Sequence, residues 1–337
     1  MLPPIDKIIF GDNQFFGINH MSEEKAQALS ERFKDTQSIL RVIDAAYECG
    51  IHAFMFNTHD RVAEICDHFR AHPQKYADLR IYPSMPYAHK YANAVNEKGM
   101  IGALNEFLFS GRTVGQAFTT LLRSGRSIIN QDMIEVMRLL VDAEMRMFKG
   151  LNIRAIFLQN IVSDLLLGMR AKPIVTAFAE HVRSTYEVEP AFNTMNLPRM
   201  VDFLEECGIR NPIVCSSINK AGYFMSPGVT EYEEALRSKV FRGIAMSVFA
   251  SGAVPAAEAI EYVCGLPNIQ GIVFGASSKS HISETQELIS SHWVRGTPTI
   301  GPHRIPITTP DAKASHAIRE PARGAVDGLA GPLAAGG

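Results

Sequence analysis

About eight short apolar runs recur along the chain, and stretches with helical hydrophobic spacing lie between them. Several runs are apolar at nearly every position, as parallel strands buried on both faces are. This alternation is typical of repeated βα units, and a count near eight favours a closed (β/α)8 TIM barrel over an open doubly wound sheet. The expected strands are Lys7–Phe10, His52–Phe56, Arg80–Ser84, Arg154–Leu158, Val188–Phe192, Pro212–Ser216, Gly243–Val248 and Gln270–Phe274.

Three predicted helices end directly before a glycine, the residue that most easily adopts the left-handed conformation of a helix C-terminus. Each glycine leads into the next expected strand. These pairs are Ser38–Cys49 with Gly50, Met200–Cys207 with Gly208, and Ala256–Cys264 with Gly265.

Two segments depart from this alternation. Residues 87–150 are expected to form an enlarged loop after the third strand, acting as a substrate cover or, alternatively, as a structural excursion or oligomer contact. Within it, Met133–Leu140 predicts an amphipathic helix. Residues 301–337 are rich in Pro, Ala and Gly, and we expect a disordered tail after a single barrel of residues 1–300.

Composition narrows the class of protein. The chain of 337 residues has 33 Lys and Arg against 35 Asp and Glu, so no basic surface for nucleic acid or membranes is expected. No apolar run is long enough to cross a bilayer, and the N-terminus does not resemble a signal peptide. The five scattered cysteines show no metal-binding spacing and indicate reduced thiols in a cytoplasmic protein.

Three segments together resemble the aldo/keto reductase superfamily of TIM barrels. Residues 265–285 are similar to that family's last strand, its Gly-Ala-Ser turn and the following helix. Ile39–Asn57 resembles its first helix and second strand, and Ala245–Gly252 its seventh strand and loop. The resemblance implies a nicotinamide dinucleotide, NADP or NAD, whose phosphate lies at Gly275, Ala276, Ser277, Ser278 and Lys279.

The residues at that turn carry a physical argument of their own. A helix that begins with serines and a lysine presents backbone N–H groups, hydroxyls and a positive dipole end to an anion. The alternative is that Ser277 or Ser278 only caps the helix.

The family's catalytic residues are replaced in this chain. The family uses an Asp and a Tyr after strand two, a Lys ending strand three and a His ending strand four. Here Asn57 stands at the Asp position, no Tyr follows, strand three ends at Ser84, and Gln159 stands where the His would be. The family's Ser-Asn pair after strand five is matched loosely by Phe192-Asn193, and its Gln on strand six by Ser216. This pattern predicts altered chemistry.

Other polar residues follow the expected strands and are candidates for the site, because reactive groups of barrels lie past the C-terminal strand ends. Asp12 could be a general base, and Asn13 and Gln14 could hold a substrate carboxylate or amide; an Asx turn is the alternative. His59 could replace the missing tyrosine as acid, or simply begin the next helix. Tyr87 could donate a proton, with Lys90 lowering its pKa or binding an anion.

Carboxamides, hydroxyls and a lysine complete a predicted polar ring for a small ligand. Its members are Gln159, Asn160, Asn193, Ser216, Asn219 and Lys220. A metal site of Asp12, His20 and His59 lacks the usual spacing, so no metal is expected.

The sequence therefore predicts a small-molecule enzyme with acid–base chemistry at a carbonyl or imine, including nicotinamide-dependent reduction with a non-standard proton donor. Two alternatives stay open. One is a non-redox lyase, isomerase or hydrolase that binds a substrate phosphate in the former cofactor site. The other is a non-catalytic ligand-binding barrel. Neither the substrate nor the oligomeric state follows from the sequence.

Overall fold

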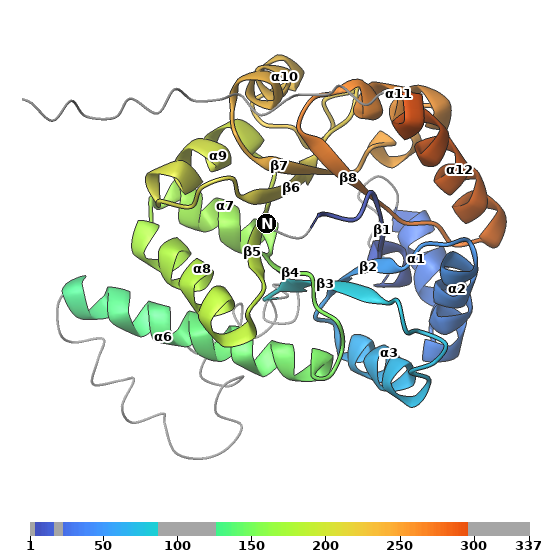
Figure 1. The fold of residues 1–337 in the computed structure, drawn as a ribbon, viewed down its shortest axis with the longest axis horizontal. Coiled ribbons are helices and arrows are strands. Elements are labelled where there is room, and N and C mark those ends of the chain that lie inside the picture. Colours follow the sequence, from blue (N-terminus) through green and yellow to red (C-terminus); the bar gives the residue numbers. More distant parts are fainter. Residues whose placement is uncertain (1–3, 17–22, 87–125, 296–337) are drawn as a thin grey trace, which may run out of the picture. The chain divides into compact units, whose positions relative to one another are not determined.

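The structure is a computed structural model, and it describes residues 4–16, 23–86 and 126–295. Eight parallel strands form a closed barrel in which every strand pairs with its sequence neighbours and β1 pairs with β8 (Figure 1). The strands are β1 (Ile8–Gly11), β2 (Ala53–Asn57), β3 (Arg80–Met85), β4 (Ala155–Leu158), β5 (Glu189–Thr194), β6 (Ile213–Ser217), β7 (Arg242–Met246) and β8 (Ile269–Phe274). The predicted (β/α)8 fold is confirmed, and each expected strand lies within two residues of an observed one.

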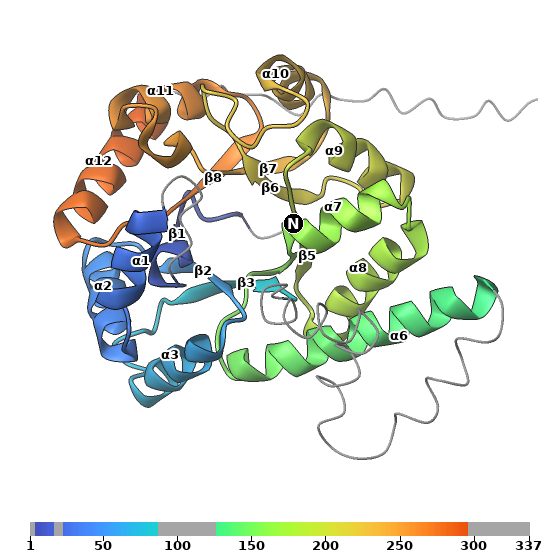
Figure 2. The ribbon, with the colours of Figure 1, turned by 180° about the vertical axis from the view of Figure 1, so that it is seen from behind.

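Helices surround the ring in both the front and the back view (Figures 1 and 2). The α-helices are α1 (Glu23–Arg32), α2 (Thr36–Glu48), α3 (Asp60–Ala71), α6 (Arg126–Met145), α7 (Asn160–Gly168), α8 (Lys172–Tyr186), α9 (Leu197–Glu206), α10 (Val229–Ser238), α11 (Ala256–Gly265) and α12 (Lys279–Arg295). The described residues also form the short 3-10 helices η1 (Asn13–Phe16), η2 (Arg146–Phe148) and η3 (Ala250–Gly252).

Apolar side chains form two main layers because successive side chains of a strand point to opposite faces. The larger cluster fills the space between strands and helices, with Phe54, Phe192 and Val214 among its members. The smaller one fills the barrel interior, with Met55 and Phe157 among its members. A packed interior leaves the ends of the barrel as the places where polar side chains gather.

Helix ends follow the expected chemistry with one exception. Gly50 and Gly208 have φ of +81° and +76°, and each follows the end of its helix as predicted. The prediction for Gly265 was wrong, because this residue is the last of α11 and Leu266 follows as the cap in an extended conformation. The helix there ends without a left-handed glycine.

Buried or half-buried ionic groups close the N-terminal end of the barrel. The Tyr82 hydroxyl donates to Asp6 Oδ2 at 2.6 Å, and Arg80 Nε donates to Asp6 Oδ1 at 2.7 Å. Arg242 Nη1 donates to Glu189 Oε2 at 2.7 Å between the starts of β7 and β5. These pairs leave the opposite, C-terminal end as the mouth where a ligand would enter.

Two predicted segments fall largely outside the described residues. Of the expected insertion 87–150, residues 126–145 form α6, which packs on α8, and residues 87–125 are not described. The predicted tail 301–337 is likewise not described, so both assignments stay predictions. Among the residues that are described, no helix is long and apolar enough to cross a membrane.

Candidate active site

A layer of polar side chains caps the apolar interior at the C-terminal strand ends. Met55, Tyr82, Phe157, Ala191 and Cys215 belong to the interior cluster. Two positions further along each strand the side chain points to the same face, because a strand repeats every two residues. Those positions hold Asn57, Ser84, Gln159, Asn193 and Ser217. Five neighbouring strands therefore place an amide or hydroxyl at the mouth.

Asp12 and Asn57 form the central contact of this layer. Asp12 follows β1 and is 3% exposed. Its Oδ2 accepts from the backbone N–H of Asn57 at 2.7 Å, and its Oδ1 accepts from Asn57 Nδ2 at 2.8 Å. Gln159 Nε2 in turn donates to Asn57 Oδ1 at 3.0 Å. Because an ionised carboxylate only accepts, Asp12 orients the Asn57 carboxamide toward Gln159.

Burial raises the pKa of the Asp12 carboxyl to about 7, although hydrogen bonds from the Asn57 backbone and side chain act in the opposite direction. Desolvation disfavours the charged form of a carboxyl, and amide donors without a cation compensate only in part. Asp12 thus exchanges a proton near neutral pH, which is the property of a general acid or base.

Asn193 lies at the equivalent position of β5 and is only 6% exposed. Its Nδ2 donates to Ser84 Oγ at 2.9 Å, and its Oδ1 has no hydrogen-bond partner. If the carboxamide were turned over, its nitrogen would lack the partner instead. Buried polar atoms are almost always hydrogen-bonded, so this atom marks a place where a ligand group would bind.

Asn13 and Gln14 lie beside this layer in η1. Asn57 Nδ2 also approaches Asn13 Oδ1 at 3.4 Å, and Asn13 is exposed. Gln14 Nε2 donates to Gly11 O at 2.9 Å. The Gln14 carboxamide packs so closely on Gly275 that a Cβ there would lie 2.1 Å from Gln14 Oε1. A residue without a side chain is therefore needed at position 275, so that Gln14 from the loop after β1 can pack on the end of β8.

His59 sits at the rim as the N-cap of α3. Its Nδ1 accepts from the backbone N–H of Arg61 at 3.2 Å, and its ring stacks on Phe16 with centroids 4.1 Å apart. This is the alternative interpretation of His59, that of a residue beginning a helix. Its Nδ1 is engaged in the cap of α3.

Several predicted ligand-binding residues do not face the mouth. Ser216 points to the outer face of β6, where its Oγ donates to Thr194 O at 2.7 Å and lies 3.1 Å from the Tyr232 hydroxyl. The strand ends one residue later than predicted, and a shift of one residue reverses the face. Ser217 takes the expected place, and its Oγ donates to Ser247 Oγ at 3.1 Å.

The loop after β6 also differs from the prediction. Asn219 is buried, its Nδ2 donates to Tyr223 O, and its Oδ1 accepts from Tyr223 N, so it holds the loop closed. Lys220 forms an exposed ion pair with Glu258 at 2.7 Å. Asn160 is the first residue of α7, where it begins the helix after β4. Tyr87 and Lys90 lie outside the described residues.

The turn after β8 leads directly into α12. Ser278 Oγ accepts from the backbone N–H of His281 at 3.4 Å and caps the helix. Ser277 Oγ accepts from Arg32 Nη1 at 3.3 Å. Lys279 pairs with Glu48 at 2.7 Å on the surface, where α12 contacts α2. Ala276 packs partly buried against the larger apolar cluster. Arg32 belongs to α1, 245 residues before Ser277, so no sequence pattern points to this contact.

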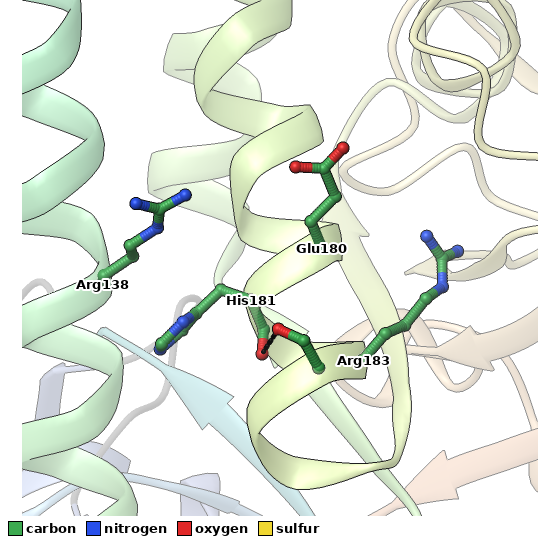
Figure 3. Close-up of a pocket in the computed structure, with 5 residues that line it drawn as sticks. Arg138, Glu180, His181 and Arg183 are labelled. Carbon is green, nitrogen blue, oxygen red and sulfur yellow. Dashed lines mark hydrogen bonds between the residues drawn. The ribbon is translucent and has the colours of Figure 1, made fainter.

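A pocket of about 660 Å³ lies elsewhere, between α6 and α8 (Figure 3). It is lined by Arg138, Glu180, His181, Arg183 and Ser184. His181 points from α8 toward α6 and bonds Asp142 at 2.7 Å, so its imidazole already has a partner. None of the predicted site residues lines this pocket, and we place the candidate site at the barrel mouth. No group of three or more potential metal ligands occurs in the described residues.

Fold and site together define a (β/α)8 barrel with a carboxamide-lined mouth and a buried acid. Among solved structures the chain is similar to a provisionally assigned aldo-keto reductase from Pseudomonas aeruginosa, with a TM-score of 0.52, 11% identity, and coverage of 86% of this chain and 91% of that one. A provisionally assigned 2,5-diketo-D-gluconic acid reductase B matches with a TM-score of 0.52, 12% identity, and coverage of 87% and 88%. These similarities confirm the expected (β/α)8 barrel fold.

No protein-family profile matches the chain, and no curated protein sequence does. At these identities the similarity extends to the fold alone. What the barrel does must be argued from its own residues.

Proposed function

We propose that this protein is a small-molecule enzyme that performs acid–base chemistry at a carbonyl or imine, with Asp12 as the acid–base group. The observation that carries the proposal is the buried Asp12 carboxyl at the barrel mouth, hydrogen-bonded to the backbone and side-chain amides of Asn57 and with a pKa of about 7. A group with a pKa near the working pH transfers protons most effectively. The protonated carboxyl gives its proton to the substrate oxygen or nitrogen and becomes a carboxylate that Asn57 stabilises.

Asn57 and Gln159 support this role from the strand ends where the family's Asp and His would stand. In this chain the carboxylate comes from the loop after β1 and reaches the end of β2 through Asn57. Gln159 bridges from β4 to Asn57, which holds the acid's partner in place. The side chains at these two strand ends, Asn57 and Gln159, therefore contact each other, and both are amides where the family has charged groups.

We also propose a nicotinamide dinucleotide as the co-reactant, which when bound would supply hydride. The residues at the start of α12 fit a phosphate: Arg32 adds a guanidinium beside Ser277, and Ser278 caps the helix whose dipole end is positive. The exposed Lys279–Glu48 pair contributes little stability, so Lys279 is available to an anion at low cost.

Fluorescence titration with NADPH and with NADH tests the cofactor. We expect binding that weakens in Arg32→Ala and Lys279→Ala. Lys220→Ala, which breaks a similar exposed pair after β6, is the matched control and leaves the affinity unchanged. No binding of either dinucleotide at high micromolar concentration removes the reductase proposal and leaves a non-redox enzyme.

Asp12→Asn tests the acid. Small aldehydes, ketones and cyclic imines are screened with the wild-type protein, and the best substrate is then given to the variant. We expect a loss of about 10²- to 10⁴-fold in kcat, the usual contribution of a positioned proton donor. Full activity of a folded Asp12→Asn variant would exclude Asp12 as the acid and favour a binding role for the barrel.

A further inference from the structure

Asp12 carries a charge that no cation in the described part of the chain compensates. Its carboxylate oxygens accept from Asn57 N and Nδ2 at 2.7 and 2.8 Å, and among the described residues it takes part in no ion pair. Burial of an unpaired carboxylate is costly, which is why buried acids usually have an Arg, Lys or metal beside them. No residue of the described part supplies this charge, and a cationic group of a ligand would compensate the carboxylate.

Three charged or titratable groups in or beside the neighbouring segment 58–61, namely His59, Arg61 and Glu144, have partners of their own. His59 caps α3 and stacks on Phe16. Arg61 donates to Phe33 O and lies over the Phe16 ring at 5.4 Å. Glu144 accepts from Thr58 Oγ1. None of these groups acts on Asp12, whose pKa is governed by burial and by its amide partners.

A second acceptor without a donor belongs to the same polar layer. Asn193 Oδ1 is buried and unpartnered, and Ser84 holds the other end of its carboxamide. Asn193 follows Phe192, whose register partner on β4 is Leu158, the residue before Gln159. The layer of Asp12, Asn57, Gln159 and Asn193 thus offers a ligand one buried negative group at one end and one free acceptor at the other.

We propose that the mouth binds a substrate with a positively charged nitrogen, a protonated imine or an amine, whose charge faces Asp12. A further N–H or O–H of the same substrate donates to Asn193 Oδ1, and Ser84 is the positioning residue that fixes this carboxamide. The inference rests on the proposed function and narrows its substrate from a carbonyl or imine to a nitrogen compound.

The proton transfer balances within this assignment. A neutral imine that enters the mouth takes the proton of the Asp12 carboxyl: the N–H bond forms, the O–H bond breaks, and an iminium remains beside a carboxylate. A carboxylate or phosphate at the same place would face the Asp12 charge with no described cation to offset it, so such substrates are disfavoured.

Three probes with the same ring and different charge test the inference: cyclohexylammonium, cyclohexanol and cyclohexanecarboxylate. Binding to the full-length protein at pH 8 is measured by ligand-detected NMR at millimolar concentration. We expect the ammonium to bind about tenfold or more tightly than the alcohol, as buried charge pairs commonly do. Asp12→Asn removes this preference, and Asp202→Asn, the same charge change at a surface ion pair with Lys239, preserves it.

Calorimetry of the wild-type protein at pH 7 in two buffers keeps the test independent of the variant's folding. Since Asp12 is partly protonated at this pH, binding of the cation releases about half a proton, whereas the alcohol releases none. Ser84→Ala weakens the preference for probes with a second donor, such as trans-4-aminocyclohexanol, and Ser84→Thr retains it.

The outcomes separate the two proposals. If the alcohol or the carboxylate binds as tightly as the ammonium, and Asp12→Asn weakens that binding, the nitrogen assignment is wrong and the acid–base site stands. If Asp12→Asn changes the binding of no probe, or if the ammonium does not bind and releases no proton, the nitrogen assignment is again overturned. An unchanged activity of Asp12→Asn on the screened substrates is the separate result that overturns the proposed function.

Discussion

Asp12 holds Asn57 at two points, through the backbone N–H at 2.7 Å and through the side-chain amide at 2.8 Å. The two residues are 45 positions apart and belong to the first and second strand ends. This contact places a buried acid at the mouth without a counter-cation in the described residues, and the stability and the chemistry of the mouth both depend on it.

The stability of the protein should depend on pH through Asp12. Its pKa is raised from 3.8 to about 7 in the folded state, so between these values the folded protein binds more protons than the unfolded chain. The protonated Asp12 carboxyl therefore stabilises the folded state fully below about pH 4, and this stabilisation is lost as the pH rises through 7. A difference of about three units between the pKa of the folded and the unfolded state corresponds to about 4 kcal/mol in the free energy of unfolding.

Urea unfolding from pH 4.5 to 8 measures this slope. The wild-type protein should lose stability toward pH 8 relative to Asp12→Asn, and Asp202→Asn should follow the wild-type curve. Parallel curves for the wild type and Asp12→Asn would show that the carboxyl titrates normally.

The substitution Gly275→Ala should destabilise the protein, because the Gln14 side chain packs directly on Gly275. The added methyl lies on the Gln14 carboxamide, so the side chain must move, at a cost of about 1 kcal/mol typical of overpacking. In a Gln14→Ala background the same substitution should cost much less, because the obstructing atoms are gone. A double-mutant cycle by urea denaturation measures the coupling, and additive effects would contradict the contact.

Ser216→Ala and Ser217→Ala should separate packing from ligand binding. Ser216→Ala removes the bond to Thr194 O and leaves the Tyr232 hydroxyl with one partner fewer, so it should cost about 1 kcal/mol of stability and leave ligand affinity unchanged. Ser217→Ala should change affinity at the mouth more than it changes stability. Thermal unfolding and probe binding of both variants decide between these roles, and reversed effects would contradict the assigned faces.

His59 variants should distinguish a helix cap from a proton donor. His59→Ala removes the cap of α3 and should cost about 1 kcal/mol, whereas His59→Ser restores a capping oxygen and most of that stability. If Asp12 is the acid, His59→Ser keeps activity within a few-fold. A large loss of activity in a stable His59→Ser variant would return the role to the imidazole.

The fold could be predicted because parallel barrel strands are buried on both faces and appear as apolar runs such as Phe54–Phe56. The polar residues at the ends of β2 and β4 could be found for the same reason, since Asn57 and Gln159 directly follow such runs. The face of a residue at a strand end was less predictable. Ending β6 one residue early placed Ser216 at the mouth, although Ser217 is the residue that points there.

Some site residues gave no sequence signal. Ser84 lies next to the end of β3, and no sequence pattern points to its bond to Asn193, which spans 109 residues. Arg32 lies on a polar helix whose sequence gives no reason to expect a contact with Ser277, 245 residues away. Contacts between residues so far apart in the chain form only when the strands close into the barrel.

The amino-acid sequence by itself determined the barrel, because the spacing of apolar runs decides which segments can be buried as parallel strands. It also determined which polar residues follow those strands. Only the tertiary structure decided that Asp12 lies against the amides of Asn57, that Gln14 packs on Gly275, and that Asn193 Oδ1 is buried without a hydrogen-bond donor. Hydrogen-bond partners and desolvation depend on distances across the closed ring, and these distances are set by packing rather than by position along the chain.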